Sequence, residues 1–522
     1  MNTTQAFKRA RNIIDRAVLG LVRSSVGIVL ILFLFTLGEA AEPNSADEVT
    51  LITEGKKCAE FTDAELDLWK SRGIDGFICH IGWLLPFGGT QFYTSNPNAN
   101  LIGAEFEMQR KFRDGNVVAR AKAKGISMYL GFYLESYWNH ATPLIDWFDD
   151  AKWQSQAIPY IQWFAETAKL LGFAGISYDS EMYGKTATWN WNYPGNTHSE
   201  AQVRAKVKER GQQVMQAILS GFPNVDIIAY TTYLPETGDE IIQAIYNKQP
   251  DAFKNYTHID FIDGLTSVNG YSAFNLSTEA FYKECYYDWL PCDKVLQEHT
   301  NKLYSLLSRR LSNWEYASEH FFQPLFFWID GPAGSTGWFV PRSAEYVASQ
   351  LDAYKKWGNG RKLLIYATQG LAFDYTPYVS GMQQASQPAV IDTLSPTLVI
   401  TDPEISGQYQ TSSSQLSLSG YAKDDMAIKA VRWTNDRGGS GAAQMNWQVF
   451  SNFTLASFAK YYLNSWDWQT NWGITDIVLQ LGPNTITLVV EDTKGLKTTQ
   501  ILNVWLISPV PPVPSNLSVS PF

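Results

Sequence analysis

The chain has 522 residues, of which 45% are hydrophobic and 18% are charged. That balance excludes intrinsic disorder, because such a chain can bury large cores, and the length suits two unequal domains. The formal net charge is −10 and no basic run occurs, which excludes nucleic acid as a partner.

Residues 1–40 are predicted to be a signal peptide. Scattered Lys and Arg precede Val26–Gly38, an uncharged apolar run shorter than the roughly 20 residues of a membrane-spanning helix. Gly38 and Ala40 provide the small residues expected before a cleavage site. We therefore expect a secreted, periplasmic or cell-surface protein, in contact with a membrane only where this segment stays uncleaved.

Cysteine spacing predicts little covalent structure. Cys285 and Cys292 are close enough in sequence to close a short loop in an oxidising compartment. Cys79 lies in an apolar run and is expected to be simply buried. No Cys or His spacing matches a zinc site, so neither a metal nor a cofactor is expected.

Residues 41–390 alternate short apolar runs with longer helical patterns, which is typical of repeated βα units. The eight predicted strands are Val49–Thr53, Gly76–Ile81, Ser127–Tyr133, Ala174–Tyr178, Asp226–Thr231, Ile259–Leu265, Pro324–Ile329 and Lys362–Ala367. The predicted helices between them include Asp63–Ser71, Glu105–Lys124, Ala157–Leu171, Glu200–Leu219, Lys294–His320 and Ser343–Trp357.

Eight such units favour a (β/α)8 TIM barrel, an α/β fold. Glycines placed between a helix and the next strand support this, because a short connection needs a left-handed residue there; they are Gly73, Gly125, Gly172 and Gly358. A doubly wound open sheet is the alternative, but no glycine-rich phosphate-binding turn follows the first strand.

Residues 391–508 change character to short alternating strands with little helix, which predicts a β-sandwich. The predicted strands are Thr397–Ile400, Gln415–Tyr421, Ile428–Trp433, Ile477–Leu481, Asn484–Glu491 and Thr498–Leu506. Ala427–Asp436, Trp472–Leu481 and Gly482–Gly495 resemble the Ig-like modules of bacterial extracellular enzymes, which implies a spacer or presentation module. Residues 509–522 form a Pro-rich linker or tail.

Acidic residues follow several predicted barrel strands, where the reactive groups of TIM barrels lie. They are Glu135 after strand three, Asp179 and Glu181 after strand four, and Asp330 after strand seven. Aromatic residues are expected around the same rim: Trp83, Tyr133, Tyr137, Trp138, Tyr178, Tyr183, Trp189, Trp191, Trp328 and Trp338. Carboxylates surrounded by aromatic rings suit glycosidic bond cleavage, which needs a protonated acid and a second group that stabilises the anomeric centre.

Asp179 and Glu181 form the most specific pattern. Residues two apart on a strand point to the same face with Cα atoms about 6.5–7 Å apart. Two carboxyl groups at that spacing raise each other's proton affinity, which can keep one of them protonated. The alternative is a strand-end Asp179 that caps the next loop, with Glu181 in solvent.

The segment Gly172–Glu181, GFAGISYDSE, resembles the fourth-strand signature of the chitinase-like glycoside hydrolases of family 18. The resemblance implies that Glu181 protonates the glycosidic oxygen while Asp179 orients the substrate's N-acetyl group as the nucleophile. Two earlier acidic positions of that family are Ala174 and Ser177 here.

A second similarity is to the large retaining clan of (β/α)8 hydrolases. It implies that Glu181 is the acid/base and Asp330 the nucleophile, although that clan normally has Glu at the end of strand seven. Carboxyl groups about 5–5.5 Å apart would indicate retention of configuration, and about 6.5–9.5 Å inversion.

Other side chains at strand ends are candidates for substrate binding. Glu135 is a substrate-binding carboxylate, a second acid or a salt-bridged loop residue, and Asp263 is a subsite contact or a buried structural residue. The remaining candidates are Trp83, Tyr133, Trp138, Tyr183, Tyr230, Tyr233, Trp328 and Gln369.

The sequence therefore predicts a secreted, monomeric glycoside hydrolase that acts on an extracellular polysaccharide or oligosaccharide without a cofactor. A catalytically inactive barrel that binds glycans or mediates adhesion is the alternative. A metal-dependent deacetylase or an esterase is disfavoured, because neither His-x-x-x-His nor G-x-S-x-G occurs.

Overall fold

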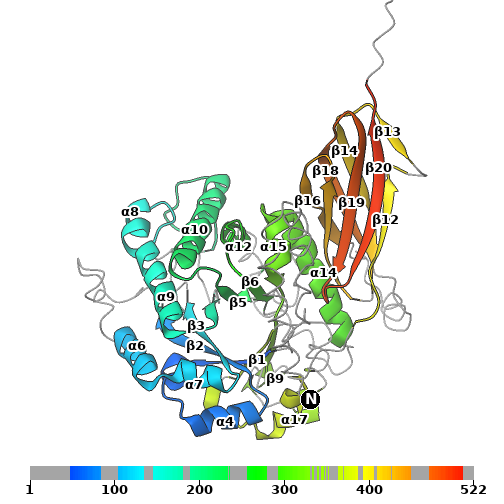
Figure 1. Ribbon diagram of the computed structural model, residues 1–522. Helices are drawn as coiled ribbons and strands as arrows, with labels where there is room; N and C mark the ends of the chain where they lie inside the picture. The colour runs from blue at the N-terminus through cyan, green and yellow to red at the C-terminus, as the bar shows by residue number, and fades with distance from the viewer. Residues whose placement is uncertain are drawn as a thin grey trace, which may run out of the picture. The chain divides into compact units, whose positions relative to one another are not determined.

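The computed structural model describes residues 48–83, 104–133, 145–179, 189–232, 234, 256–278, 292–329, 332–333, 338–339, 343–345, 347–348, 351, 362–367, 370–385, 392–404, 408–424, 426–447 and 469–508. They all belong to one compact unit, Ala46–Phe522, which contains a barrel and a sandwich (Figure 1). Among these residues, no helix has both the length and the apolar character needed to cross a membrane.

A parallel sheet closes on itself to form the predicted (β/α)8 barrel, with the order β7-β6-β5-β4-β3-β2-β1-β11-β8. The seventh barrel strand is interrupted at Gln323 and Pro324: its first part pairs with β6 and its second part with β11, which closes the ring. The bounds are β1 Glu48–Glu54, β2 Gly76–Trp83, β3 Ser127–Tyr133, β4 Gly175–Asp179, β5 Asp226–Thr232, β6 Ala273–Thr278, β7 Phe321–Phe322, β8 Leu325–Trp328 and β11 Lys362–Tyr366. A short two-stranded sheet, β9 Pro332–Ala333 and β10 Trp338–Phe339, lies between β8 and β11 in the chain.

The sixth predicted strand is wrong. Ile259–Leu265 lies in helix α12, His258–Thr266, and the sixth barrel strand is β6 further along the chain. Eight of the nine residues of α12 are buried, including Asp263. The apolar run is only about as long as a strand, and a run of that length cannot be told from a buried strand by periodicity alone.

The helices cover the outside of the barrel, largely where the sequence predicts them. The bounds are α3 Gly55–Cys58, α4 Asp63–Ser71, α6 Ala104–Gly115, α7 Val117–Ala123, α8 Asp150–Lys152, α9 Ile158–Leu171, α10 Glu200–Gly221, α14 Cys292–Arg310, α15 Trp314–His320 and α17 Val379–Ala385. Single helices predicted over Glu105–Lys124 and Lys294–His320 are each divided in two, the first at Asn116, whose φ is 48°. Most of Ser343–Trp357 lies outside the described residues.

Left-handed glycines end three of the helix-to-strand connections as predicted. Gly73, Gly125 and Gly172 have φ of 86°, 68° and 83°. Gly358 lies outside the described residues. A side chain at these positions would be strained, so the glycines set the short turns that return the chain to the sheet.

A disulfide joins Cys58 and Cys79, and thus links α3 to β2. Cys79 is buried as expected, but the sequence analysis missed its partner. Nothing in the spacing distinguishes Cys58 from the other cysteines, because the pairing depends on how α3 packs against the barrel. The predicted Cys285–Cys292 pairing falls outside the described residues, since Cys285 is not among them.

The C-terminal region is a β-sandwich of two sheets, with strand orders β12-β14-β18-β17 and β13-β20-β19-β15-β16. Its strands are β12 Thr397–Asp402, β13 Tyr409–Thr411, β14 Gln415–Lys423, β15 Ile428–Asn435, β16 Ser440–Ala442, β17 Gln444–Trp447, β18 Thr470–Val478, β19 Gly482–Asp492 and β20 Lys497–Leu506. The predicted strand Ile477–Leu481 is misplaced, because β18 begins at Thr470 and ends at Val478.

Hydrogen bonds join the sandwich to the two helices that follow β6. The hydroxyl of Ser308 in α14 accepts from the Met445 amide at 2.9 Å, and Arg432 donates to the Ser318 hydroxyl at 3.0 Å. The Ser440 hydroxyl donates to Glu315 in α15 at 2.7 Å. The sandwich is therefore packed against the barrel helices.

A buried ionic cluster lies at the amino end of the barrel. Nζ of Lys362 lies 2.7 Å from the Tyr129 hydroxyl, 3.1 Å from Oδ2 of Asp226 and 3.6 Å from Oε2 of Glu48. These four residues belong to β11, β3, β5 and β1, so the cluster ties together four strands of the ring.

Candidate active site

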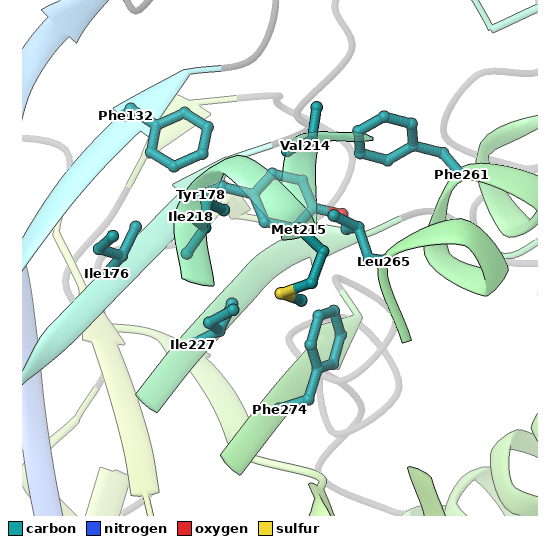
Figure 2. A pocket seen from close by; sticks show the side chains of 10 residues that line it. All are labelled: Phe132, Ile176, Tyr178, Val214, Met215, Ile218, Ile227, Phe261, Leu265 and Phe274. Carbon is teal, nitrogen blue, oxygen red and sulfur yellow. The ribbon is translucent and has the colours of Figure 1, made fainter. Parts of the chain in front are cut away.

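The two faces of β4 have different surroundings. Ile176 and Tyr178 point outward and line an apolar pocket with side chains of α10 and α12 (Figure 2). The Tyr178 hydroxyl lies 3.3 Å from Nε2 of His258 in the same layer. This pocket belongs to the packing between sheet and helices, so the opposite face of β4 is the one that faces the barrel interior.

Asp179 lies at the carboxyl end of β4 on that opposite, inner face. Since side chains alternate along a strand, Gly175, Ser177 and Asp179 face the barrel interior when Ile176 and Tyr178 face outward. Asp179 is only 3% exposed. A carboxyl group at this end of a barrel strand occupies the position where TIM-barrel enzymes hold reactive groups.

Tyrosines occupy the neighbouring positions on the adjacent strands. Asp179 is in register with Tyr133 of β3 on one side and with Tyr230 of β5 on the other. Tyr230 is 3% exposed, and its ring lies edge-on to the imidazole of His80, with centroids 5.4 Å apart. Tyr230 therefore provides an aromatic ring on the inner wall beside Asp179.

His80 and Ser177 lie on either side of Gly131. A Cβ atom on Gly131 would lie 3.0 Å from both Nδ1 of His80 and the Ser177 hydroxyl, so a larger residue there would displace one of them. Burial lowers the pKa of His80 to about 3, which keeps the imidazole uncharged at neutral pH. Ser177 is fully buried, and its hydroxyl has no hydrogen-bond partner within the described part of the chain.

The structure locates some of the predicted site residues and not others. Asp179 and Tyr230 are brought together as expected. Tyr133, Trp83 and Trp328 end β3, β2 and β8, so their backbones reach the same end of the barrel. The predicted residues outside the described part are Glu135, Trp138, Glu181, Tyr183, Tyr233, Asp330 and Gln369.

Asp263 lies elsewhere than predicted, because it belongs to α12 and not to a strand end. Its Oδ1 accepts hydrogen bonds from the amide and hydroxyl of Ser312 at 2.7 and 2.8 Å, and its Oδ2 pairs with Lys208 at 2.7 Å. This arrangement matches the structural alternative that the sequence left open.

Two aromatic residues expected at the rim, Tyr178 and Trp189, lie instead in the layer between the barrel sheet and its outer helices. Trp189 is fully buried, with its ring 4.5 Å from the imidazole of His258 and 5.4 Å from the ring of Phe261. Tyr178 faces the same helical layer. Both follow or belong to β4, so sequence position alone does not separate the rim from the packing layer behind it.

From the sequence, His80 is expected to be a core or rim residue and not a catalyst, and Ser177 is noted only as the position of a missing acidic residue. Both lie at alternate positions that face the barrel interior. On β2 these positions are Ile78 and His80, and on β4 they are Gly175, Ser177 and Asp179. Strand alternation therefore contained a signal for them. The described residues of the barrel contain no group of three side chains arranged to bind a metal.

Comparison with known proteins adds the following. No protein-family model matches the sequence, and no curated protein matches it. Solved structures with a similar fold include the endo-β-1,4-mannanase of Thermotoga petrophila, at 10% identity and a TM-score of 0.37, over 90% of this chain and 99% of that one.

Two further similar structures are glycoside hydrolases as well. A family 5 enzyme of Prevotella bryantii, in complex with a xyloglucan oligosaccharide, has 14% identity and a TM-score of 0.37 over 63% of this chain and 87% of that one. The family 20 modules of a pneumococcal exo-β-D-N-acetylglucosaminidase have 10% identity and a TM-score of 0.37, over 67% and 86%. Scores of this size say nothing about activity, which is inferred below from the residues of the barrel itself.

Proposed function

We propose that the protein is a glycoside hydrolase that cleaves a polysaccharide or oligosaccharide, with Glu181 as the general acid. The observation that carries this proposal is the buried carboxyl group of Asp179, at the carboxyl end of the fourth barrel strand and between Tyr133 and Tyr230 in register. A carboxyl group beside the aromatic ring of Tyr230 suits a sugar ring that develops positive charge at its anomeric carbon.

Glu181 follows Asp179 by two residues, and we assign it the proton transfer to the leaving oxygen. Asp179 then stabilises the positive centre or orients a substrate N-acetyl group, and Asp330 is the other candidate for the partner carboxylate. The uncharged Ser177 favours a role for Asp330, because the substrate-assisted route of family 18 has an acidic residue at that position. Neither route needs a cofactor.

We further propose that the protein acts outside the cytoplasm, as a monomer. The disulfide between Cys58 and Cys79 supports this location, because such bonds persist mainly in oxidising compartments. The predicted signal peptide points the same way. The sandwich then serves as an Ig-like spacer that presents the barrel to a polymer.

The test is reducing-end release from chitin-type and β-glucan-type polymers by the wild type and by Glu181→Gln, Asp179→Asn and Asp330→Asn. We expect Glu181→Gln to lose at least a hundredfold in turnover while it still binds oligosaccharide, since acid catalysis typically contributes 10²–10⁴-fold. Glu166→Gln, which changes an exposed residue of α9, is the matched control and should keep full activity.

A glycan-binding barrel without activity is the second candidate, and Ser177 is the observation that favours it. The fully buried serine stands where the resemblance to family 18 requires an acidic residue. Under this alternative no polymer is cleaved by the wild type, while oligosaccharide binding is measurable and weakens on substitution of Tyr230. Turnover by the wild type that Glu181→Gln retains would contradict the assignment of the acid.

A further inference from the structure

Three carboxylates meet where the segment after the barrel enters the sandwich. Asp392 precedes β12, Asp424 follows β14 and Asp492 ends β19 (Figure 1). One oxygen from each lies within 4.8 Å of the others. Residues this far apart in sequence are brought together only by the fold.

Each carboxylate is held in place by a hydrogen bond from the backbone two residues further on. Leu394 donates to Oδ1 of Asp392 at 3.0 Å, Met426 to Oδ2 of Asp424 at 3.1 Å, and Lys494 to Oδ1 of Asp492 at 2.7 Å. Leu496 donates a second bond to Oδ1 of Asp492 at 3.0 Å. In Asp392 and Asp492 these bonds use one oxygen only, Oδ1.

The second oxygen of Asp492 is left without a partner in a buried place. Asp492 is fully buried, and its Oδ2 has no hydrogen bond within the described residues; the same holds for the buried Oδ2 of Asp392. A buried carboxylate oxygen without a hydrogen bond is costly, which favours a bound cation at this place.

Among the described residues, three cationic side chains of the sandwich are engaged with a different carboxylate. Three cationic residues pair with the preceding residue, Glu491: Lys429 at 3.4 Å, Arg432 at 2.6 Å and Lys497 at 3.4 Å. Within the described part of the chain, no Lys or Arg forms an ion pair with Asp392 or Asp492. Strand alternation explains this difference, because Glu491 and Asp492 point to opposite faces of β19.

We propose that Asp392, Asp424 and Asp492 bind one Ca²⁺ ion that fastens the segment after the barrel to the sandwich. Calcium takes oxygen ligands at about 2.3–2.6 Å, so two ligands of one ion lie at most about 4.6–5.2 Å apart, and oxygens within 4.8 Å of one another are compatible with one ion. Magnesium usually keeps several waters and is bound through one or two carboxylates, so three protein carboxylates favour calcium. Three carboxylates carry enough charge for a divalent cation, and water or backbone oxygens complete the coordination.

The test is calorimetric titration of the chelator-treated full chain with CaCl₂, together with thermal unfolding of the sandwich with and without calcium. We expect one equivalent to bind with Kd at or below about 10⁻³ M, the weak limit for extracellular calcium sites, and the sandwich to melt at higher temperature in calcium. Asp392→Asn should weaken binding at least tenfold. Asp392 lies before the first sandwich strand, so this variant tests the site without altering a strand. Asp492→Asn is the second variant.

Asp476→Asn is the matched control. Asp476 is exposed on β18 with φ of 61°, a conformation that Asn also tolerates, so this variant should bind calcium as the wild type does. The site would be overturned if the wild type binds no calcium at about 10 mM CaCl₂, ten times the weakest Kd expected. It would also be overturned if Asp392→Asn binds calcium with unchanged affinity. Equal affinity for MgCl₂ would overturn its assignment to calcium.

Discussion

Lys362 at the amino end of the barrel gives the sharpest prediction on stability. At an effective dielectric constant of about 20, a charge pair at the 3.1 Å that separates Lys362 from Asp226 gains about 5 kcal/mol before the cost of desolvation. Loss of one partner of a buried pair typically costs about 3–5 kcal/mol, since the remaining charges stay buried. The side chains of Glu48 and Asp226 are 18% and 19% exposed, so we expect Lys362→Met to cost about 3 kcal/mol, at the lower end.

The measurement is urea unfolding, combined with hydrogen exchange of the barrel strands to separate the barrel from the sandwich. Lys70→Met is the control, because Lys70 pairs with Asp75 at 2.6 Å with its side chain 40% exposed. Such a surface pair contributes about 1 kcal/mol or less. A loss in Lys362→Met no larger than in Lys70→Met would refute the reasoning.

A second variant separates lost charge from lost packing. Adding Glu48→Gln and Asp226→Asn to Lys362→Met removes the unpaired anions, and most of the lost stability should return. The neutral amides can still accept from Thr50, which donates to Glu48 at 2.8 Å, and from Asn275, which donates to Asp226. If the triple variant is no more stable than Lys362→Met, packing and not charge explains the effect.

The pH dependence of this difference follows from the pKa of Lys362. Burial alone would lower it, but Glu48, Asp226 and Tyr129 raise it well above its ordinary value of 10.5. When folding raises the pKa of a cationic group, the group stabilises the folded state. This stabilisation is complete at pH values below the pKa of the unfolded chain, and it is lost only as the pH rises through the pKa of the folded state. The stability difference between Lys362→Met and the wild type should therefore be constant between pH 7 and pH 9.

Two further predictions concern a buried imidazole and a helix crossing. Because the pKa of His80 falls from 6.5 to about 3 on folding, the stability it contributes is present above pH 6.5 and is lost as the pH falls. Between pH 7 and pH 4 the wild type should lose about 3 kcal/mol more than His80→Gln in urea unfolding, and equal acid sensitivity would contradict this. Gly264→Ala should cost about 3 kcal/mol or more, because the added Cβ would lie 2.1 Å from the Lys208 carbonyl where α12 crosses α10. Gly473→Ala has no atom within 4 Å of the new Cβ and should change the unfolding midpoint little; equal losses in the two variants would argue against the close crossing.

The sequence predicts the barrel well because most of its strands have clear boundaries. Ser127–Tyr133 matches β3 residue for residue, and Asp63–Ser71 matches α4, which begins with a capping box between Thr62 and Glu65. The failure at α12 has a local cause: the helix has nine residues, eight of them buried, so its apolar run is as short as a buried strand. Long periodic segments are predicted well, and short buried ones are ambiguous.

The candidate sites differ in how well their residues can be predicted from the sequence. The position of Asp179 at the carboxyl end of a barrel strand could be predicted, because it follows from the pattern of the strand itself; its role in catalysis stays a prediction. The carboxylates of Asp392, Asp424 and Asp492 were not predicted to be neighbours, because long stretches of chain separate them. Only the fold brings them together: β12 pairs with β14 in one sheet, and β19 lies in the other. Similarly, the partner of Cys79 depends on the packing of α3 and not on spacing.

The two ends of the barrel are electrostatically separate, and this separation bears on the proposed chemistry. On β5 and β11 the apolar residues Ile228 and Leu364 stand between the amino-end ionic cluster and the carboxyl end, within a buried apolar layer. Lys362 pairs with Glu48 and Asp226 at the amino end. Lys362→Met should accordingly lower stability while leaving the pH profile of turnover unchanged, whereas Asp179→Asn should shift that profile.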